Sequence, residues 1–188
     1  MVARQTAQTT GPHTIADYDA LPDDGRRYEL IDGALIEMPS PSALHQTVQV
    51  ALASLLFAVV MQGRLGRVFV SPMDVYLGGM LVQPDLFYVA AAHDDIVMAN
   101  RIIGAPDLII EILSPSTRTH DLTTKRNLYR SVGVREYWTV DLEARSATVW
   151  ALVGDRYVER QPDEQGHHAS TVLPGFTVDV AAVIASVE

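Results

Sequence analysis

Three residues of this sequence have the types and surroundings of a hydrolytic metal site: Asp85, Glu111 and Lys125. Glu111 stands inside the apolar run 108–113, and Asp85 follows Pro84 in a second apolar run. A buried carboxylate is costly unless it is paired, hydrogen-bonded, bound to a metal or protonated. Two carboxylates on one Mg²⁺ or Mn²⁺ ion leave positions open for water and phosphate, and a lysine can orient the water or stabilise the developing charge. These residues indicate metal-assisted phosphodiester hydrolysis.

Each of the three also has a purely structural explanation. Glu111 could be an acid paired with an arginine, and Asp85 could form a turn after Pro84. Lys125 could bury its aliphatic stem and extend its amine to solvent. Lys125 is, however, the only lysine in the chain, the other 13 of the 14 basic residues being arginines.

The strand expected over residues 108–113 must position Glu111. Side chains alternate between the faces of a strand, so Ile109, Glu111 and Leu113 share one face. Both faces are otherwise apolar, as is typical of a central strand covered by helices, and Glu111 is therefore expected to be buried. If the strand that carries Asp85 is its neighbour, about 4.8 Å away, the two carboxylates can converge on one cation.

A helix expected over residues 122–132 must position Lys125. Asp121 is a plausible N-cap and Gly133 a plausible stop. Lys125 lies three and four residues before Leu128 and Tyr129, so it shares their apolar face. That face packs on the sheet and directs the amine toward Glu111.

The remaining segments complete an α/β pattern with a mixed sheet. Residues 1–12 are expected to form a disordered tail and residues 13–188 one domain. The expected elements are a hairpin around Asp32-Gly33, a helix over residues 42–62, two long strands (66–77 and 80–90) joined at Gly78-Gly79, and three strands after residue 135. This order predicts an α/β domain with a partly antiparallel sheet.

Composition limits the class of protein. The chain has 188 residues, 48% of them hydrophobic, and no cysteine, which fits one globular domain in a reducing compartment. No secretory signal and no apolar run near ~20 residues is apparent, so a cytoplasmic protein without a membrane partner is expected. The net charge of −9 argues against binding nucleic acid with the whole surface. Basic residues nevertheless gather after Glu111, and Arg118, Arg126 and Arg130 are candidates for contacts with a nucleic-acid backbone.

An ordered series of motifs resembles the Uma-two family of restriction-endonuclease-like proteins, within the PD-(D/E)XK nuclease superfamily. The motifs are YELIDG, SPSALHQ, QPDLFYV, PDLIIEILSPST, DLTTKRNLY and GVREYWTVD, and the resemblance covers about residues 14–183. It implies a restriction-endonuclease-like mixed sheet flanked by helices, with an αβββαβ core, and Mg²⁺-dependent DNA cleavage.

The resemblance also implies roles for particular residues. Asp85 matches the PD element and Glu111 the acid of the (D/E)XK element, while Leu113 stands where the superfamily has lysine. Lys125 on the following helix matches the lysine that takes over in this family. Glu29 would correspond to an accessory catalytic acid, or could be a surface residue of its hairpin. His45, at the start of the long helix, is a hydrogen-bonding residue or a ligand.

The leading hypothesis is therefore an endonuclease in which Asp85 and Glu111 bind Mg²⁺ or Mn²⁺ and Lys125 assists catalysis. One alternative is a nuclease-fold module that no longer cuts and instead binds nucleic acid or protein. A hydrolase for a smaller phosphoester is a third possibility. A homodimer is plausible, because many nucleases cut two strands with two copies, but no motif identifies its interface.

Overall fold

The computed structural model describes residues 8, 9 and 11–188. Most of the tail expected over residues 1–12, namely residues 1–7 and 10, lies outside the described residues. Within the described part, Gln8–Thr9 form the short strand β1, which pairs with residues 35 and 36.

The main sheet of the described chain has six strands in the order β12-β11-β10-β9-β7-β4. In chain order these strands are β4 (Gly66–Val70), β7 (Leu86–Ala90), β9 (Leu108–Leu113), β10 (Glu136–Asp141), β11 (Ser146–Val153) and β12 (Arg156–Arg160). Strands β9 and β10 are parallel, and the other neighbours are antiparallel. The expected strand 108–113 is confirmed, and all six of its residues are buried, as a central strand requires.

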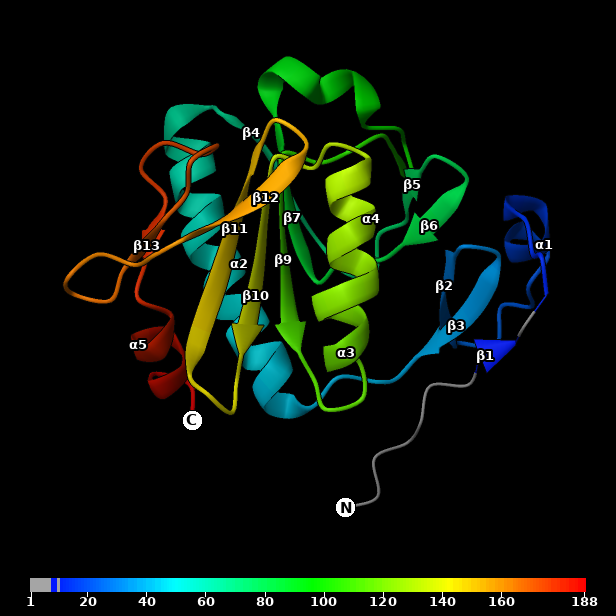
Figure 1. The fold of residues 1–188 in the computed structure, drawn as a ribbon, viewed down its shortest axis with the longest axis horizontal. Helices are drawn as coiled ribbons and strands as arrows, with labels where there is room; N and C mark the ends of the chain where they lie inside the picture. Colours follow the sequence, from blue (N-terminus) through cyan, green and yellow to red (C-terminus); the bar gives the residue numbers. More distant parts are fainter. Residues whose placement is uncertain (1–7, 10) are drawn as a thin grey trace.

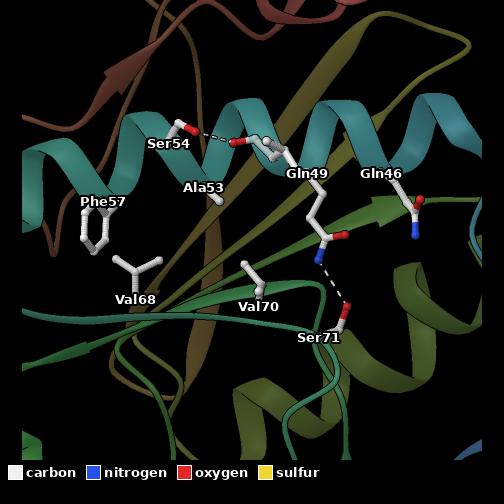
Figure 2. A pocket seen from close by; sticks show the side chains of 9 residues that line it. Gln46, Gln49, Ala53, Ser54, Phe57, Val68, Val70 and Ser71 are labelled. Carbon is white, nitrogen blue, oxygen red and sulfur yellow. Dashed lines mark hydrogen bonds between the residues drawn. The ribbon is translucent and has the colours of Figure 1, made fainter.

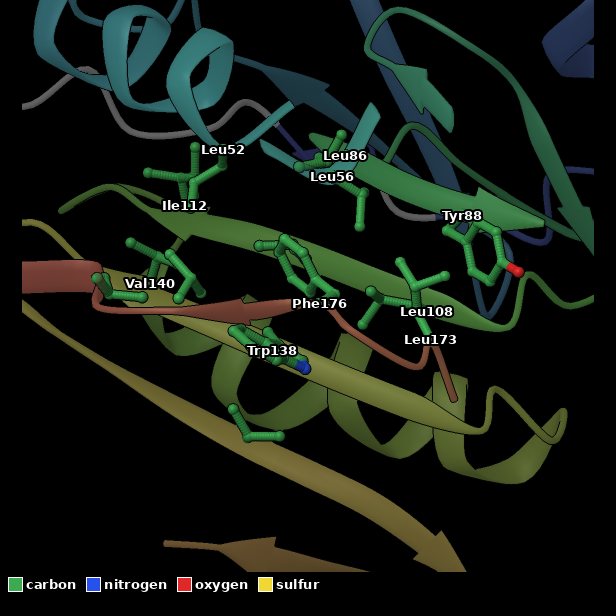
Figure 3. Packing of buried hydrophobic residues seen from close by; sticks show 14 of the residues in the cluster. Leu52, Leu56, Leu86, Tyr88, Leu108, Ile112, Trp138, Val140, Leu173 and Phe176 are labelled. Atoms are coloured by element: carbon green, nitrogen blue, oxygen red, sulfur yellow. The ribbon is translucent and has the colours of Figure 1, made fainter. Parts of the chain in front are cut away.

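Helix α2 (Ala43–Gly63) covers one face of this sheet (Figure 1). Ser42 caps its N-terminus by accepting a hydrogen bond from the His45 amide, and Arg64 in the left-handed conformation ends it. Residues at helical spacing along α2 pack onto apolar side chains of β7, β9 and β10, with Phe176 and the short helix α5 (Val180–Ala185) completing the layer (Figure 3).

The expectation that no apolar segment approaches ~20 residues was wrong for α2. Its 21 residues are long and apolar enough to cross a membrane by length and composition alone. In this fold one side of the helix belongs to the core, with Val48, Leu52 and Leu56 fully buried. Packing in the core therefore accounts for the apolar residues on that side of α2. The apolar residues on the opposite side are not explained by the core.

The opposite face of the main sheet is covered by a helical segment between β9 and β10. It consists of α3 (Arg118–His120), the π-helical turn η2 (Asp121–Lys125) and α4 (Arg126–Ser131). Asp121 was expected to be an N-cap, but it has helical dihedral angles inside this segment. That expectation was wrong because the helix begins one turn earlier, at Arg118.

A second six-stranded sheet of the described chain lies beside this helical side, in the order β1-β3-β2-β6-β5-β8. Its other strands are β2 (Arg27–Ile31), β3 (Ala34–Met38), β5 (Val75–Leu77), β6 (Met80–Val82) and β8 (Ile102–Ile103). Four further short elements are α1 (Ile15–Asp19), the 3-10 helix η1 (Ala91–Ile96) and the paired strands β13 (His168–Ala169) and β14 (Thr177–Val178).

The two long strands expected over residues 66–77 and 80–90 are each divided. The chain leaves the main sheet after β4, through Pro72, and returns to it through Pro84 before β7. Between these prolines the hairpin β5–β6, with its turn at Gly78-Gly79, joins the second sheet. Proline cannot donate to a strand ladder, so each proline ends a strand where the chain changes sheets.

The chain thus has the expected α/β architecture. The series α2, β4, β7, β9, the helical segment 118–131 and β10 reproduces the αβββαβ order around a mixed sheet. Because β7 and β9 are neighbours, and Leu86 pairs with Ile110, the residue before β7 lies beside Glu111.

Candidate active site

The structure brings Glu29, Glu111 and Lys125 into direct contact and places Asp85 beside them. Lys125 Nζ lies 2.8 Å from Glu29 Oε1 and 3.0 Å from Glu111 Oε1. It also lies 3.6 Å from Asp121 Oδ1. The side chains of Glu29, Glu111, Lys125 and Asp121 are buried, whereas that of Asp85 is partly exposed.

Glu111 is fixed by hydrogen bonds at both carboxylate oxygens. Tyr129 donates its hydroxyl to Oε1 at 2.8 Å, next to the Lys125 ammonium. The backbone amide of Asp85 donates to Oε2 at 3.2 Å. The acid is thus held between the helical segment on one side and the start of β7 on the other.

Asp85 is the more open of the two central acids, with 18% of its side chain exposed. Its Oδ2 accepts a hydrogen bond from the amide of Ile112 at 2.9 Å and lies 3.1 Å from Nε2 of His45. Within the described chain its Oδ1 makes no hydrogen bond, so this oxygen is free to bind a ligand. Gln49 of α2 donates to the Asp85 carbonyl oxygen at 2.5 Å, which fixes the backbone there.

The electrostatics of the cluster are dominated by burial and an excess of acids. Burial raises the pKa of Glu111 to about 8, helped by the nearby acids and opposed by Lys125. Burial likewise raises the pKa of Asp121 to about 6. Burial disfavours the charge of Lys125, but Glu111, Glu29 and Asp121 outweigh it and raise the pKa of the ammonium well above its usual value. Lys125 is therefore charged, and the cluster lacks enough positive charge for all its acids.

Glu29 reaches the cluster from the second sheet. Its Oε1 accepts a hydrogen bond from the amide of Gln83 at 3.0 Å, so Glu29 is no surface residue of its hairpin. Its Oε2 is buried without a hydrogen-bond partner among the described residues and lies 3.8 Å from Nε2 of His120, whose pKa is lowered by burial. His120 also lines a cavity of about 330 Å³ beside the β2–β3 hairpin, together with hydroxyl side chains from residues 116, 117 and 124.

No group of three or more His, Asp and Glu side chains in the described chain is arranged to enclose a metal ion. Asp85 and Glu111 remain as two adjacent oxygen donors at the partly open end of the cluster. Mg²⁺ is commonly bound by one or two carboxylates, with waters and substrate phosphates completing its coordination. A pair of carboxylates is thus a donor set suited to this ion.

Comparison with known proteins places the chain in a family. The family model described as "Uma2: Putative restriction endonuclease" matches residues 15–181. The chain belongs to the Uma2 family. No curated protein matches it.

A solved structure has the same fold as this Uma2 chain. The crystal structure of a putative nuclease belonging to DUF820 from Anabaena variabilis ATCC 29413 superposes with a TM-score of 0.78. The two sequences are 21% identical, and the match covers 94% of this chain and 100% of the other. Family membership and this restriction-endonuclease-like fold support a nuclease role.

The three arginines expected to contact a nucleic acid do not converge on the acidic cluster of this Uma2 protein. Arg118 pairs with Asp141 at 2.6 Å, at the carboxyl end of β10 and so near the site. Arg126 stacks over the ring of Trp150, with 5.4 Å between its guanidinium carbon and the ring centroid. Arg130 donates to the carbonyl of residue 155, in the turn after β11, at the end of the sheet away from Asp85.

Two residues of the Uma2 cluster were not recognised in the sequence as part of a site. Asp121 was interpreted as a helix cap, and Tyr129 as an apolar core residue. A signal was present, because Asp121, Lys125 and Tyr129 are spaced four residues apart and so lie along one face of a helix. His45 was expected to be either a hydrogen-bonding residue or a ligand. In the structure it hydrogen-bonds the carboxylate of Asp85.

Proposed function

We propose that this protein is an Mg²⁺- or Mn²⁺-dependent endonuclease that hydrolyses phosphodiester bonds in DNA. The observation that carries the proposal is a cluster in which Glu29, Glu111 and Asp121 surround a single lysine and Asp85 lies beside Glu111. Four acids and one ammonium leave a negative excess in a largely buried place, which is costly unless acids are protonated or a cation binds. Burial, with a smaller contribution from the neighbouring acids, raises the pKa of Glu111, as expected for a buried carboxyl group when no cation is present.

Asp85 and Glu111 would hold the cation. Asp85 offers a free oxygen at the exposed edge of the cluster, and Glu111 is directly beside it. The ion, when bound, would lower the pKa of a coordinated water and polarise a phosphate oxygen. Both carboxylates are held by backbone and side-chain hydrogen bonds, so they are positioned before substrate arrives.

Lys125 and His45 would act through these two acids. Lys125 is buried between Glu111 and Glu29, so its ammonium offsets the charge of both and fixes the direction of the Glu111 carboxylate. His45, whose pKa is raised by its hydrogen bond to Asp85 against the effect of burial, holds Oδ2 of that acid and leaves Oδ1 for the ion. Its contact with Asp85 supports a positioning role for His45.

DNA is proposed as the substrate because the family description reads "Putative restriction endonuclease", and restriction endonucleases act on DNA. Arg118 lies near the site, and its side chain is 45% exposed beside Asp141, where it can reach a phosphate backbone. Arg126 and Arg130 are already engaged by the protein, so they are weaker candidates for this contact.

Cleavage of supercoiled plasmid and of labelled single strands, with Mg²⁺, with Mn²⁺ and with a chelator, tests the proposal. Wild-type protein is compared with Glu111→Gln and with Glu164→Gln, the same substitution at an exposed position outside the site. We expect cutting that needs metal, is lost in Glu111→Gln and is kept in Glu164→Gln. Cutting that survives in Glu111→Gln would refute the assignment.

Calorimetry with Mg²⁺ and Mn²⁺ separates the nuclease from a module of the same fold that no longer cuts. The charge excess around Lys125 favours a site that binds a cation, so binding is expected even without DNA. A wild-type protein that binds neither ion and cuts no substrate would instead be a binding module for nucleic acid or protein.

A further inference from the structure

Helix α2 has an apolar side that no part of the described chain covers. Val50, Phe57 and Met61 are 65%, 54% and 55% exposed, and they follow one another at helical spacing on the side away from the core. Only 28% of the residues in the apolar window of α2 are buried. Large apolar side chains exposed together on one side of a helix ordinarily mark a contact surface, so this stripe is a candidate site for a partner.

A free strand edge lies beside the stripe. Strand β4 is the last strand of the main sheet among the described residues, and it pairs on one side only, with β7. In an antiparallel pair alternate residues direct their N–H and C=O groups away from the partner strand, so β4 offers unpaired backbone groups along its outer edge. Such an edge is a template for pairing with another strand.

A groove of about 600 Å³ joins the helix stripe to the strand (Figure 2). Phe57 and Val50 line it from α2, and Val68 and Val70 line it from β4. Its remaining lining residues are Gln46, Gln49, Ala53, Ser54 and Ser71. The groove, the stripe and the edge of β4 form one continuous surface, called here the α2–β4 face.

The lack of charge in the groove of the α2–β4 face restricts which class of partner can bind there. None of the nine residues that line the groove is charged. A nucleic-acid backbone is bound through Lys and Arg, and helices that lie on membranes are typically rich in these residues on their polar side. Helix α2 contains neither, so an uncharged protein surface is the partner that fits.

We propose that the α2–β4 face is the interface of a homodimer. A second copy, related by a two-fold axis, supplies a β4 edge of the same length in antiparallel orientation and continues the main sheet across the axis. The two α2 helices then lie on the same side of the joined sheet, so that the stripe of one copy covers that of the other. The absence of charge in the groove matters because each copy carries a net charge of −9, and a charged groove would be repelled by its own copy. Arg67, the one charged residue of β4, is paired with Asp94 of its own chain.

Sedimentation velocity of the full chain over a concentration series, without metal or DNA, tests this interface independently of the nuclease proposal. Phe57→Glu places a charge in the stripe, and Val153→Glu places the same charge at a valine that is equally exposed, at 54%, on β11. We expect dimers for the wild type and for Val153→Glu. Phe57→Glu should raise the dimer dissociation constant at least about 30-fold, as expected when an aromatic anchor of an interface is lost.

Thiol cross-linking locates the interface without relying on a disruptive change, because the chain has no cysteine of its own. Ser54→Cys places a thiol in the lining of the groove, and Ser131→Cys is its control. Both serines are exposed on helices and donate to a carbonyl within the same helix. A short bis-maleimide should link two copies of Ser54→Cys and leave Ser131→Cys as monomer.

Several results would overturn the proposal. They are a wild-type monomer at every concentration, a dimer that Phe57→Glu leaves unchanged, and cross-linking through position 131 instead of 54. Monomers that float with vesicles of neutral phosphatidylcholine would assign the α2–β4 face to a membrane.

Discussion

Replacing Glu111 with glutamine removes the buried acid while keeping its size, and its effect on stability should depend on pH. The pKa of Glu111 is raised by burial from an ordinary 4.5 to about 8. The folded state therefore binds this proton more tightly than the unfolded state does. Its contribution to stability is complete below pH 4.5 and is lost as the pH rises toward 8.

The size of the effect follows from the pKa difference, since each pKa step corresponds to about 1.4 kcal/mol. In the metal-free wild type, ionisation of Glu111 lowers the free energy of unfolding by less than ~1 kcal/mol at pH 5 and by about 4 kcal/mol at pH 8. Glutamine does not ionise, but its NH2 group, which takes the place of Oε2, cannot accept the hydrogen bond from the backbone amide of Asp85. The loss of this hydrogen bond costs about 1 kcal/mol at either pH. The free energy of unfolding of Glu111→Gln should thus equal that of the wild type within about 1 kcal/mol at pH 5 and exceed it by about 3 kcal/mol at pH 8.

Urea unfolding with a chelator present, followed by the fluorescence of the buried Trp138 and Trp150, measures this difference. Glu143→Gln is the control, because that acid is exposed and its replacement should change neither value. The reasoning about the buried charge is refuted if the gap between Glu111→Gln and wild type is the same at pH 5 and pH 8, or if the variant is the less stable protein at pH 8.

Two further predictions concern the cation and the lysine. Saturating Mg²⁺, at about 100 times its dissociation constant, should raise the wild-type melting temperature by about 5–10 °C in scanning fluorimetry, because an ion that binds only the folded state stabilises it. Asp85→Asn should abolish that rise, and an undiminished rise would exclude Asp85 as a ligand. Lys125→Met leaves Glu29 and Glu111 without their ammonium and should cost about 3–5 kcal/mol at pH 8 in urea unfolding. A change below ~1 kcal/mol would show that the buried lysine does not offset these acids.

The sequence predicted the central strand of the site well because its signal is local. The run 108–113 is apolar on both faces apart from Glu111, and burial on both sides is what its position in the sheet requires. The strands over residues 136–141 and 146–153 likewise occupy the expected segments. Their pairing partners, in contrast, are distant in the chain and leave no local pattern.

The errors lie where tertiary structure overrides local preference. The runs 66–77 and 80–90 each have strand propensity throughout, yet each contributes to two sheets, and only the prolines indicate where they divide. The clustering of positive charge after Glu111 suggested one basic surface. Arg126 and Arg130 lie one helical turn apart but extend toward Trp150 and the β11–β12 turn, because α4 packs along the sheet rather than over its acidic end.

The single lysine of the chain gives the site a chemical property of its own. Lys125 Nζ is the only side-chain amine in the sequence, and the side chain is 1% exposed. An amine-selective acylating reagent can therefore modify a side chain of this protein only after the helical segment moves away from Glu29 and Glu111. The rate of that acylation reports the local opening of the acidic cluster, separately from global unfolding. Binding of any ligand that holds the cluster closed will slow it, which makes Lys125 an intrinsic label for occupancy of the site.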